Sequence, residues 1–148
     1  ADRSIGSARE EYRELQELVN SGEFAIENTW LQPITGSRVN LIGNTNYMRF
    51  INDSISLHLP YYGERYSGGG YDRDGGINYK GPLKNLDIIE DPEDRRIRIN
   101  FEAQQNSEDL WFSLILFPNG KVDTSVRSSQ RSSVSYDGEI KPLPEKFR

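Results

Sequence analysis

The feature that most constrains this chain is a change in the spacing of its apolar residues after Gly22, from a helical period to a strand period. Beyond that point, short segments alternate apolar and polar side chains, most cleanly in "RRIRINFEA" at residues 95–103. Alternation of period two is typical of strands that have one dry face and one wet face. The segments are too close together for helical crossovers, so they are predicted to pair antiparallel.

One helix is predicted before the strands, over about residues 7–20. "SARE", which begins at Ser7, has the form of a capping box, in which Ser7 and Glu10 would satisfy backbone N–H groups. "NSG" is a typical stop, with Gly22 suited to the left-handed position after a helix. The apolar stripe of this helix needs a surface to pack on. It consists of Tyr12, Leu15, Leu18 and Val19.

About eight to ten short strands are predicted in a β-rich body at residues 23–141, followed by a loosely held tail at 142–148. A length of 148 residues suits a single domain spanning residues 1–148. The predicted class is α+β, mainly β: an antiparallel meander forming a strongly curved sheet or a small, lipocalin-like barrel, because closure removes exposed edges. A two-layer helix-on-sheet fold is the alternative. "NG" at Asn119–Gly120 predicts a hairpin with a type I′ turn.

Composition excludes several kinds of site. The chain has a formal charge of −5 and no long basic stripe, so we expect no nucleic-acid partner. It has no cysteine and one histidine, which rules out disulfides, thiolate metal sites and multi-histidine metal sites within one chain. We therefore expect neither a metal nor a cofactor. No apolar run approaches the roughly 20 residues of a membrane span.

Catalytic signatures are scarce. His58, the single histidine, falls on the polar side of its strand, and the chain has no "GxSxG" nucleophile motif. A carboxylate-based hydrolase stays open, since the spacing of such a pair is set in three dimensions, although no feature marks a pair. "DRDGG", beginning at Asp72, fails the calcium-loop pattern. "RSSQRSS" is either a polar hairpin loop or an anion site built on Arg127 and Arg131. These patterns favour a binding protein over an enzyme.

The strongest candidate for a ligand site is the segment from Leu59 to Leu83, which holds five of the eight tyrosines and seven of the thirteen glycines. Tyrosine offers a large contact area and a hydroxyl group, and glycine allows a close approach. The alternative is that these rings pack under a long connection. The candidate ligand-binding residues are Tyr61, Tyr62, Tyr66, Tyr71 and Tyr79.

"LWFSLILF", at residues 110–117, departs from the alternation because it is apolar on both faces. Its second face, with Trp111, Ile115 and Phe117, is either covered by the N-terminal helix or a folded-over loop, or available to a lipid or a partner. The first interpretation is favoured, because the helix needs a docking surface. A structural or assembly protein that binds another protein through this face is the second functional hypothesis.

The order of several motifs resembles a family of secreted Bacteroidetes proteins catalogued as a domain of unknown function, number 4251. The motifs are "LPYYG", "DGGI", "FPNG" and "RSSVSYDGEI", and the likeness spans about Arg9 to Ile140. The resemblance implies export to the periplasm or the envelope surface, with membrane contact only through a removed lipid anchor. It implies no catalytic residue. We therefore expect a non-catalytic envelope module that binds a glycan, a peptide or a small apolar ligand.

Overall fold

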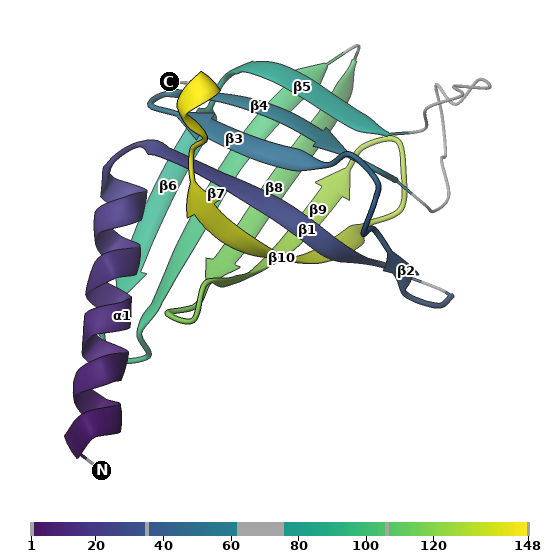
Figure 1. The fold of residues 1–148 in the computed structure, drawn as a ribbon. Coiled ribbons are helices and arrows are strands. Elements are labelled where there is room, and N and C mark those ends of the chain that lie inside the picture. The colour runs from purple at the N-terminus through teal and green to yellow at the C-terminus, as the bar shows by residue number, and fades with distance from the viewer. Residues whose placement is uncertain (1, 35, 62–75, 106, 148) are drawn as a thin grey trace.

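The computed structural model describes residues 2–34, 36–61, 76–105 and 107–147, and the side chains from residue 9 onward (Figure 1). These residues form an N-terminal helix, ten strands and a short 3₁₀ helix. Their bounds are α1 Asp2–Asn20, β1 Glu23–Pro33, β2 Val39–Asn40, β3 Tyr47–Ile51, β4 Ser54–Leu59, β5 Ile77–Pro82, β6 Lys84–Asp91, β7 Arg96–Gln105, β8 Glu108–Leu116, β9 Lys121–Ser128, β10 Val134–Pro142 and η1 Glu145–Phe147.

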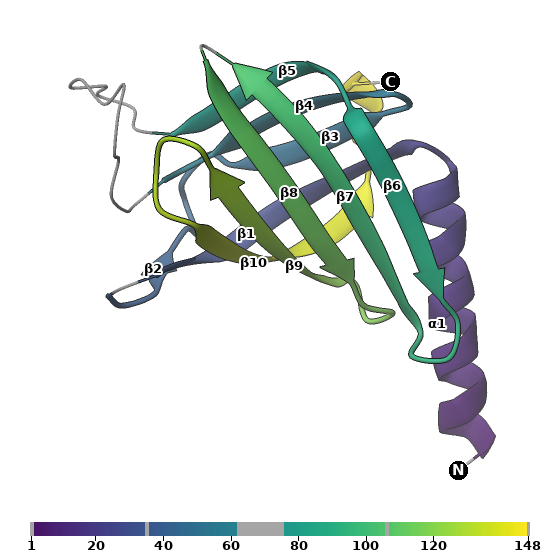
Figure 2. The same ribbon diagram turned by 180° about the vertical axis from the view of Figure 1, so that it is seen from behind.

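The strands form one antiparallel sheet in the order β5-β4-β3-β1-β10-β9-β8-β7-β6, with β2 paired to β1. The last long strand pairs with the first along its length, from Phe24 opposite Pro142 to Pro33 opposite Val134. The meander therefore wraps into a nearly closed barrel (Figures 1 and 2). Its seam lies between β5 and β6, which are joined through Leu83. The predicted mainly-β, barrel-like fold is confirmed over the two-layer alternative.

Inward-facing side chains fill the barrel. Phe24 stacks on Phe50 with ring centroids 4.5 Å apart, and Phe101 stacks on Phe112 at 4.6 Å. Phe50 meets the edge of Phe101 at 5.7 Å, so the four rings form one continuous chain across the interior. Such packing resembles a solid core rather than an empty calyx.

Helix α1 adds its apolar stripe to this core through Tyr12, Leu15 and Val19. It lies beside β6, where Gln16 Nε2 donates to Glu90 Oε2 at 3.2 Å. Gly22 adopts a φ of 76°, as predicted for the residue that stops the helix. The predicted start is wrong: the helix begins at Asp2, so the capping-box motif lies inside it. No proline lies before the motif, so no residue there prevents the helix from beginning earlier than Ser7.

The hairpin at Asn119–Gly120 forms as predicted, but its turn is not type I′. Only Gly120 has a positive φ, of 91°, and its N–H donates to the Phe117 carbonyl at 2.9 Å. Type I′ requires positive φ at both central residues. The connection is instead a three-residue loop that ends in a left-handed glycine.

The C-terminal tail is docked rather than loose. Leu143 is 1% exposed, and the Arg49 guanidinium carbon lies 3.7 Å from the centroid of the Phe147 ring. The tail therefore packs against the sheet through one aliphatic and one aromatic residue. Within the described chain, no helix combines the length and hydrophobicity needed to cross a bilayer.

Candidate functional site

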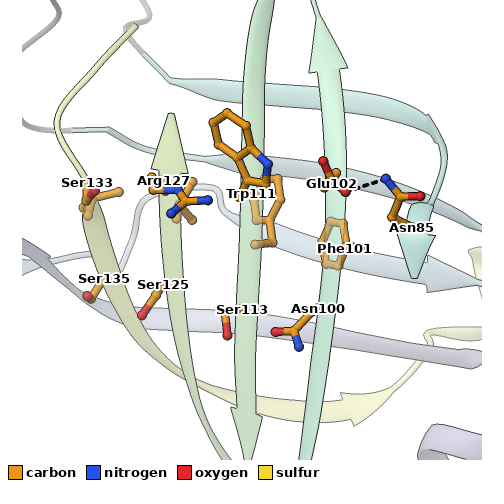
Figure 3. A pocket seen from close by; sticks show the side chains of 13 residues that line it. Asn85, Asn100, Phe101, Glu102, Trp111, Ser113, Ser125, Arg127, Ser133 and Ser135 are labelled. Atoms are coloured by element: carbon orange, nitrogen blue, oxygen red, sulfur yellow. Dashed lines mark hydrogen bonds between the residues drawn. The ribbon is translucent and has the colours of Figure 1, made fainter. Parts of the chain in front are cut away.

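A groove of about 550 Å³ lies on the outer face of β7, β8, β9 and β10 (Figure 3). Inward-facing residues of these strands, such as Phe112 and Val126, are buried and form the layer beneath it. The strands hold their outward side chains in fixed positions because each pairs with its neighbours over most of its length. The groove therefore lies on strands that are regularly paired with their neighbours.

Four small polar side chains form a row across the groove. The strand register places Asn100 opposite Ser113, Ser113 opposite Ser125, and Ser125 opposite Ser135. Directly opposite side chains on one face stand about 4.5–5.5 Å apart. The row therefore presents three hydroxyl groups and one amide at nearly regular spacing, and Figure 3 shows it running from β7 to β10.

A second row, one step along the strands, contributes an aromatic surface and two charges. Trp111 lies opposite Glu102 on one side and opposite Arg127 on the other. The Arg127 guanidinium carbon is 4.8 Å from the centroid of the indole ring, a cation–π contact that steadies both side chains. Trp111 is half-buried, so part of its ring stays accessible.

A bulge in β6 completes one end of the groove. The register between β6 and β7 shifts between Lys84 and Asp87, and Asn85 adopts a φ of 52°. Bulges re-aim side chains, and here Asn85 Nδ2 donates a hydrogen bond to a carboxylate oxygen of Glu102. Glu102 is therefore oriented by its neighbour, with its second oxygen left for another donor.

Charge in the groove is balanced. Glu102 and Arg127 are its only charged lining residues within the described chain. Glycoside hydrolysis by the usual mechanism needs two carboxyl groups at about 5–9.5 Å across a bond. The described lining supplies a single carboxylate, so it suits hydrogen bonding and stacking.

A pair of carboxylates does occur elsewhere on the outer face, where Asp123 of β9 lies opposite Asp137 of β10. Burial raises the pKa of Asp123, and a side-chain hydrogen bond with Asp137 and the charge of Asp137 add to the effect. Carboxyl groups bonded to each other leave no space between them for a glycosidic bond. Arg38 also binds Asp137 at 2.9 Å, which makes this a surface charge network.

Two of the five tyrosines proposed as ligand-binding residues lie in the barrel interior. Tyr61 is 8% exposed and its hydroxyl donates to the Ser132 carbonyl at 3.0 Å, while Tyr79 is 9% exposed and donates to the Pro82 carbonyl at 2.8 Å. The register puts Tyr79 opposite Leu57, four residues before Tyr61, or about 13 Å along the strand. Tyr62, Tyr66 and Tyr71 lie outside the described residues.

The structure separates the two arginines of "RSSQRSS". Arg127 faces outward beside Trp111, whereas Arg131 is 6% exposed and binds Glu108 inside the barrel. They do not come together, so the anion-site alternative does not hold. His58 lies half-buried on the outer face as predicted, with Nδ1 in a hydrogen bond to Asn78 Oδ1.

The second apolar face of β8 is not covered by α1, so the helix part of the favoured interpretation is wrong (Figure 2). Arginines of neighbouring strands lie over it instead: Arg127 over Trp111, and Arg96 over Phe117 with its guanidinium carbon 5.1 Å from the ring centroid. Long arginine side chains cover apolar surface while their charged ends stay in water. The helix instead packs onto the barrel interior.

Comparison with known proteins places the chain in a family. The model of the domain of unknown function DUF4251 matches residues 7–140, nearly the whole chain. The chain belongs to the DUF4251 family. Among solved structures, it is similar to a DUF4251 family protein from Bacteroides eggerthii, with 14% identity, coverage of 93% of this chain and 91% of that one, and a TM-score of 0.67. A search of curated proteins returned no match.

This likeness shows that the DUF4251 fold is kept at low sequence identity. Sequence reasoning did not identify the groove, since its four polar residues are ordinary outward positions of four separate strands. The one sequence signal was Trp111, which stands on the outward face of a strand that is apolar on both sides.

Proposed function

We propose that this DUF4251 protein is an exported, non-catalytic binding module of the cell envelope that holds a neutral glycan in the outer groove. The observation that carries the proposal is the row of Asn100, Ser113, Ser125 and Ser135 beside Trp111. The part of the indole ring that the Arg127 guanidinium does not cover can pack against the C–H groups of a sugar, while hydroxyl and amide groups bond to its hydroxyls. Balanced charge favours a neutral ligand. Export is supported by the family resemblance in "LPYYG" and "RSSVSYDGEI".

The packed interior argues against a small apolar ligand inside the barrel. The continuous chain of rings from Phe24 to Phe112 occupies the space that a lipocalin leaves for its ligand. A groove of about 550 Å³ lies within the range of small-molecule sites and holds one or two sugar rings.

Affinity electrophoresis through gels that contain neutral polysaccharides tests the proposal. We expect at least one polysaccharide to retard the protein, and Trp111→Ala to abolish the retardation because it removes the stacking surface. Ser113→Val should weaken it, since it replaces a hydroxyl of the row with a methyl group. The melting temperature of each variant shows whether the fold is kept.

Trp30→Phe is the matched control, because it removes the only other tryptophan and leaves the groove intact. This variant should bind as the wild type does, and the fluorescence of its single Trp111 should then shift on addition of the bound sugar. Normal retardation of a folded Trp111→Ala variant, or no retardation by any neutral polysaccharide, would contradict the proposal.

A protein partner is the second candidate function, and the edge strand β6 favours it. Leu86, Ile88 and Ile89 are 39–43% exposed, and β6 pairs on one side only. An extended segment of another protein can add to such an edge through backbone hydrogen bonds. Chemical cross-linking in cells should then capture a partner, and Ile89→Lys should prevent the capture. An unchanged cross-link in this variant would exclude β6.

A further inference from the structure

A second, smaller pocket of about 170 Å³ lies on the outer face of β3, β4 and β5, on strands that contribute nothing to the groove. The strand register sets Arg49 opposite Ser56, and Ser56 opposite Lys80. A serine hydroxyl is thus flanked by two cations. Ser54 adds a second hydroxyl to the lining, and Ile51 gives it an aliphatic wall.

Arg49 is held in place by two aromatic rings. Its guanidinium carbon lies 3.7 Å from the ring centroid of Tyr47 and 3.7 Å from that of Phe147, which belongs to the docked C-terminal 3₁₀ helix. Stacking occupies the faces of the planar guanidinium and leaves its N–H donors at the edge. The side chain is therefore oriented before any ligand arrives, which reduces the entropy lost on binding.

Neither cation has a carboxylate partner among the described residues, and neither donates a hydrogen bond to them. Lys141, in the same row of the sheet, does have a carboxylate partner, since its Nζ lies 3.2 Å from Glu27 Oε2. The hydroxyls of Ser54 and Ser56 also lack hydrogen-bond partners in the described chain. The wall of the pocket is mainly apolar, and its two charged residues, Arg49 and Lys80, are both cations.

We propose that this pocket binds a phosphate or sulfate group. A guanidinium, an ammonium and two hydroxyl groups offer donors from several directions, which suits a tetrahedral oxyanion better than a planar carboxylate. The aliphatic wall at Ile51 then contacts the organic part of a phosphate or sulfate ester. This site is separate from the glycan groove and does not depend on it.

Titration with inorganic phosphate and with inorganic sulfate, followed by the amide NMR signals of Ser54, Ser56 and Lys80, tests the proposal. We expect saturable shifts confined to β3–β5 with at least one of the two anions. Acetate should bind at least about tenfold more weakly, because it has fewer acceptor oxygens. Methyl phosphate and methyl sulfate then distinguish the two sources of the group.

Arg49→Gln and Lys80→Gln should each weaken binding about tenfold, by removing one charge-assisted donor set. Lys141→Gln is the matched control, because it makes the same change in net charge in the same row of the sheet, at a lysine that already has a partner. It should bind as the wild type does. Equal weakening in all three variants, or shifts that never saturate, would overturn the proposal by showing a general salt effect. If Arg49→Gln loses its fold, Lys80→Gln decides alone.

Discussion

Arg131 and Glu108 form a bidentate ion pair inside the barrel, with Arg131 Nε 2.7 Å from Glu108 Oε2 and Nη2 3.0 Å from Oε1. Their side chains are 6% and 9% exposed. The hydroxyl of Ser128 donates to the same carboxylate, and the Tyr61 ring lies 4.9 Å from the Arg131 guanidinium carbon. Arg131 Nη2 also donates to the Gly76 carbonyl at 3.5 Å. The pair therefore connects the loop after β9 to β8 and to the residues that precede and follow segment 62–75.

Breaking this pair from one side should be strongly destabilising. Arg131→Met leaves the Glu108 carboxylate buried without its cation, and we expect a loss of about 3–5 kcal/mol in the free energy of unfolding, measured by urea denaturation. Arg38→Met is the control, since it breaks an ion pair with Asp137 in which both side chains are about half exposed. That loss should be below about 1 kcal/mol.

The double variant Glu108→Met/Arg131→Met tests the reason for the loss. Replacing both charges with apolar side chains of similar volume leaves neither charge of the pair buried, so the double variant should be more stable than Arg131→Met alone. A double variant that is less stable than the single would mean that packing by the guanidinium, and not charge pairing, is what matters at this position.

Gly138 has no room for a side chain. A Cβ at this position would lie 2.3 Å from the Glu27 carbonyl oxygen and 2.8 Å from Asn28 Cα, both of which are backbone atoms at the bulge of β1. We expect Gly138→Ala to cost about 2–3 kcal/mol, because the backbone must shift to relieve the overlap. Urea denaturation measures this. Glu139→Ala, at the exposed neighbouring residue, should change stability by less than about 0.5 kcal/mol. Equal losses of stability in Gly138→Ala and Glu139→Ala would contradict the close approach of β1 and β10 at Gly138.

Tyr12 carries a buried hydroxyl that has no hydrogen-bond partner in the described chain. Burial raises its pKa, and the nearby charges of Glu90 and Asp91 raise it further. A buried polar group without a partner costs free energy, so Tyr12→Phe should leave stability unchanged or raise it by about 1 kcal/mol. Tyr136→Phe is the contrasting variant, because its hydroxyl donates to the Pro60 carbonyl at 2.6 Å. It should lose about 1 kcal/mol. Thermal denaturation of both variants measures the two changes in stability. Destabilisation by Tyr12→Phe would contradict the prediction, because it would mean that the Tyr12 hydroxyl makes a hydrogen bond.

The strands of the barrel could be predicted from the sequence because the alternation of apolar and polar residues within each strand shows which side chains face inward. Alternation in "RRIRINFEA" gave the inward face of β7, and short connections gave antiparallel pairing. The same alternation bears on two of the tyrosines. Tyr61 continues the inward series of Leu57 and Leu59, and Tyr79 follows Ile77. Their burial follows from the pattern of period two.

The groove could not be read from the sequence in this way. Ser113 and Ser125 face outward in the patterns of their own strands, and nothing local distinguishes them from other solvated serines. Only the register between β8 and β9 places them side by side. Register depends on the bulges and turns of the whole barrel, as with Asn85 in the β6 bulge, and these are set by tertiary packing.

Stability should depend on pH through Asp123. Burial, with the hydrogen bond and the charge of Asp137, raises its pKa in the folded protein. An acid whose pKa is raised by folding binds its proton more tightly in the folded state, so its contribution is complete at low pH and is lost as pH rises through the folded pKa. Asp123→Asn removes this loss of stability at high pH, because asparagine does not ionise. It should therefore be more stable than the wild type at pH 7, by about 0.5 kcal/mol for an exposed pair of like charges.

The difference between Asp123→Asn and the wild type should disappear near pH 3, where the Asp123 carboxyl group, whose pKa is raised, carries its proton. Urea denaturation at the two pH values measures it. Asp87→Asn is the matched control, since Asp87 is exposed on β6 and faces the neutral Asn100. It should show no such gain at pH 7. A gain of the same size in both variants would mean that the overall charge of −5, and not the contact between Asp123 and Asp137, sets the pH dependence.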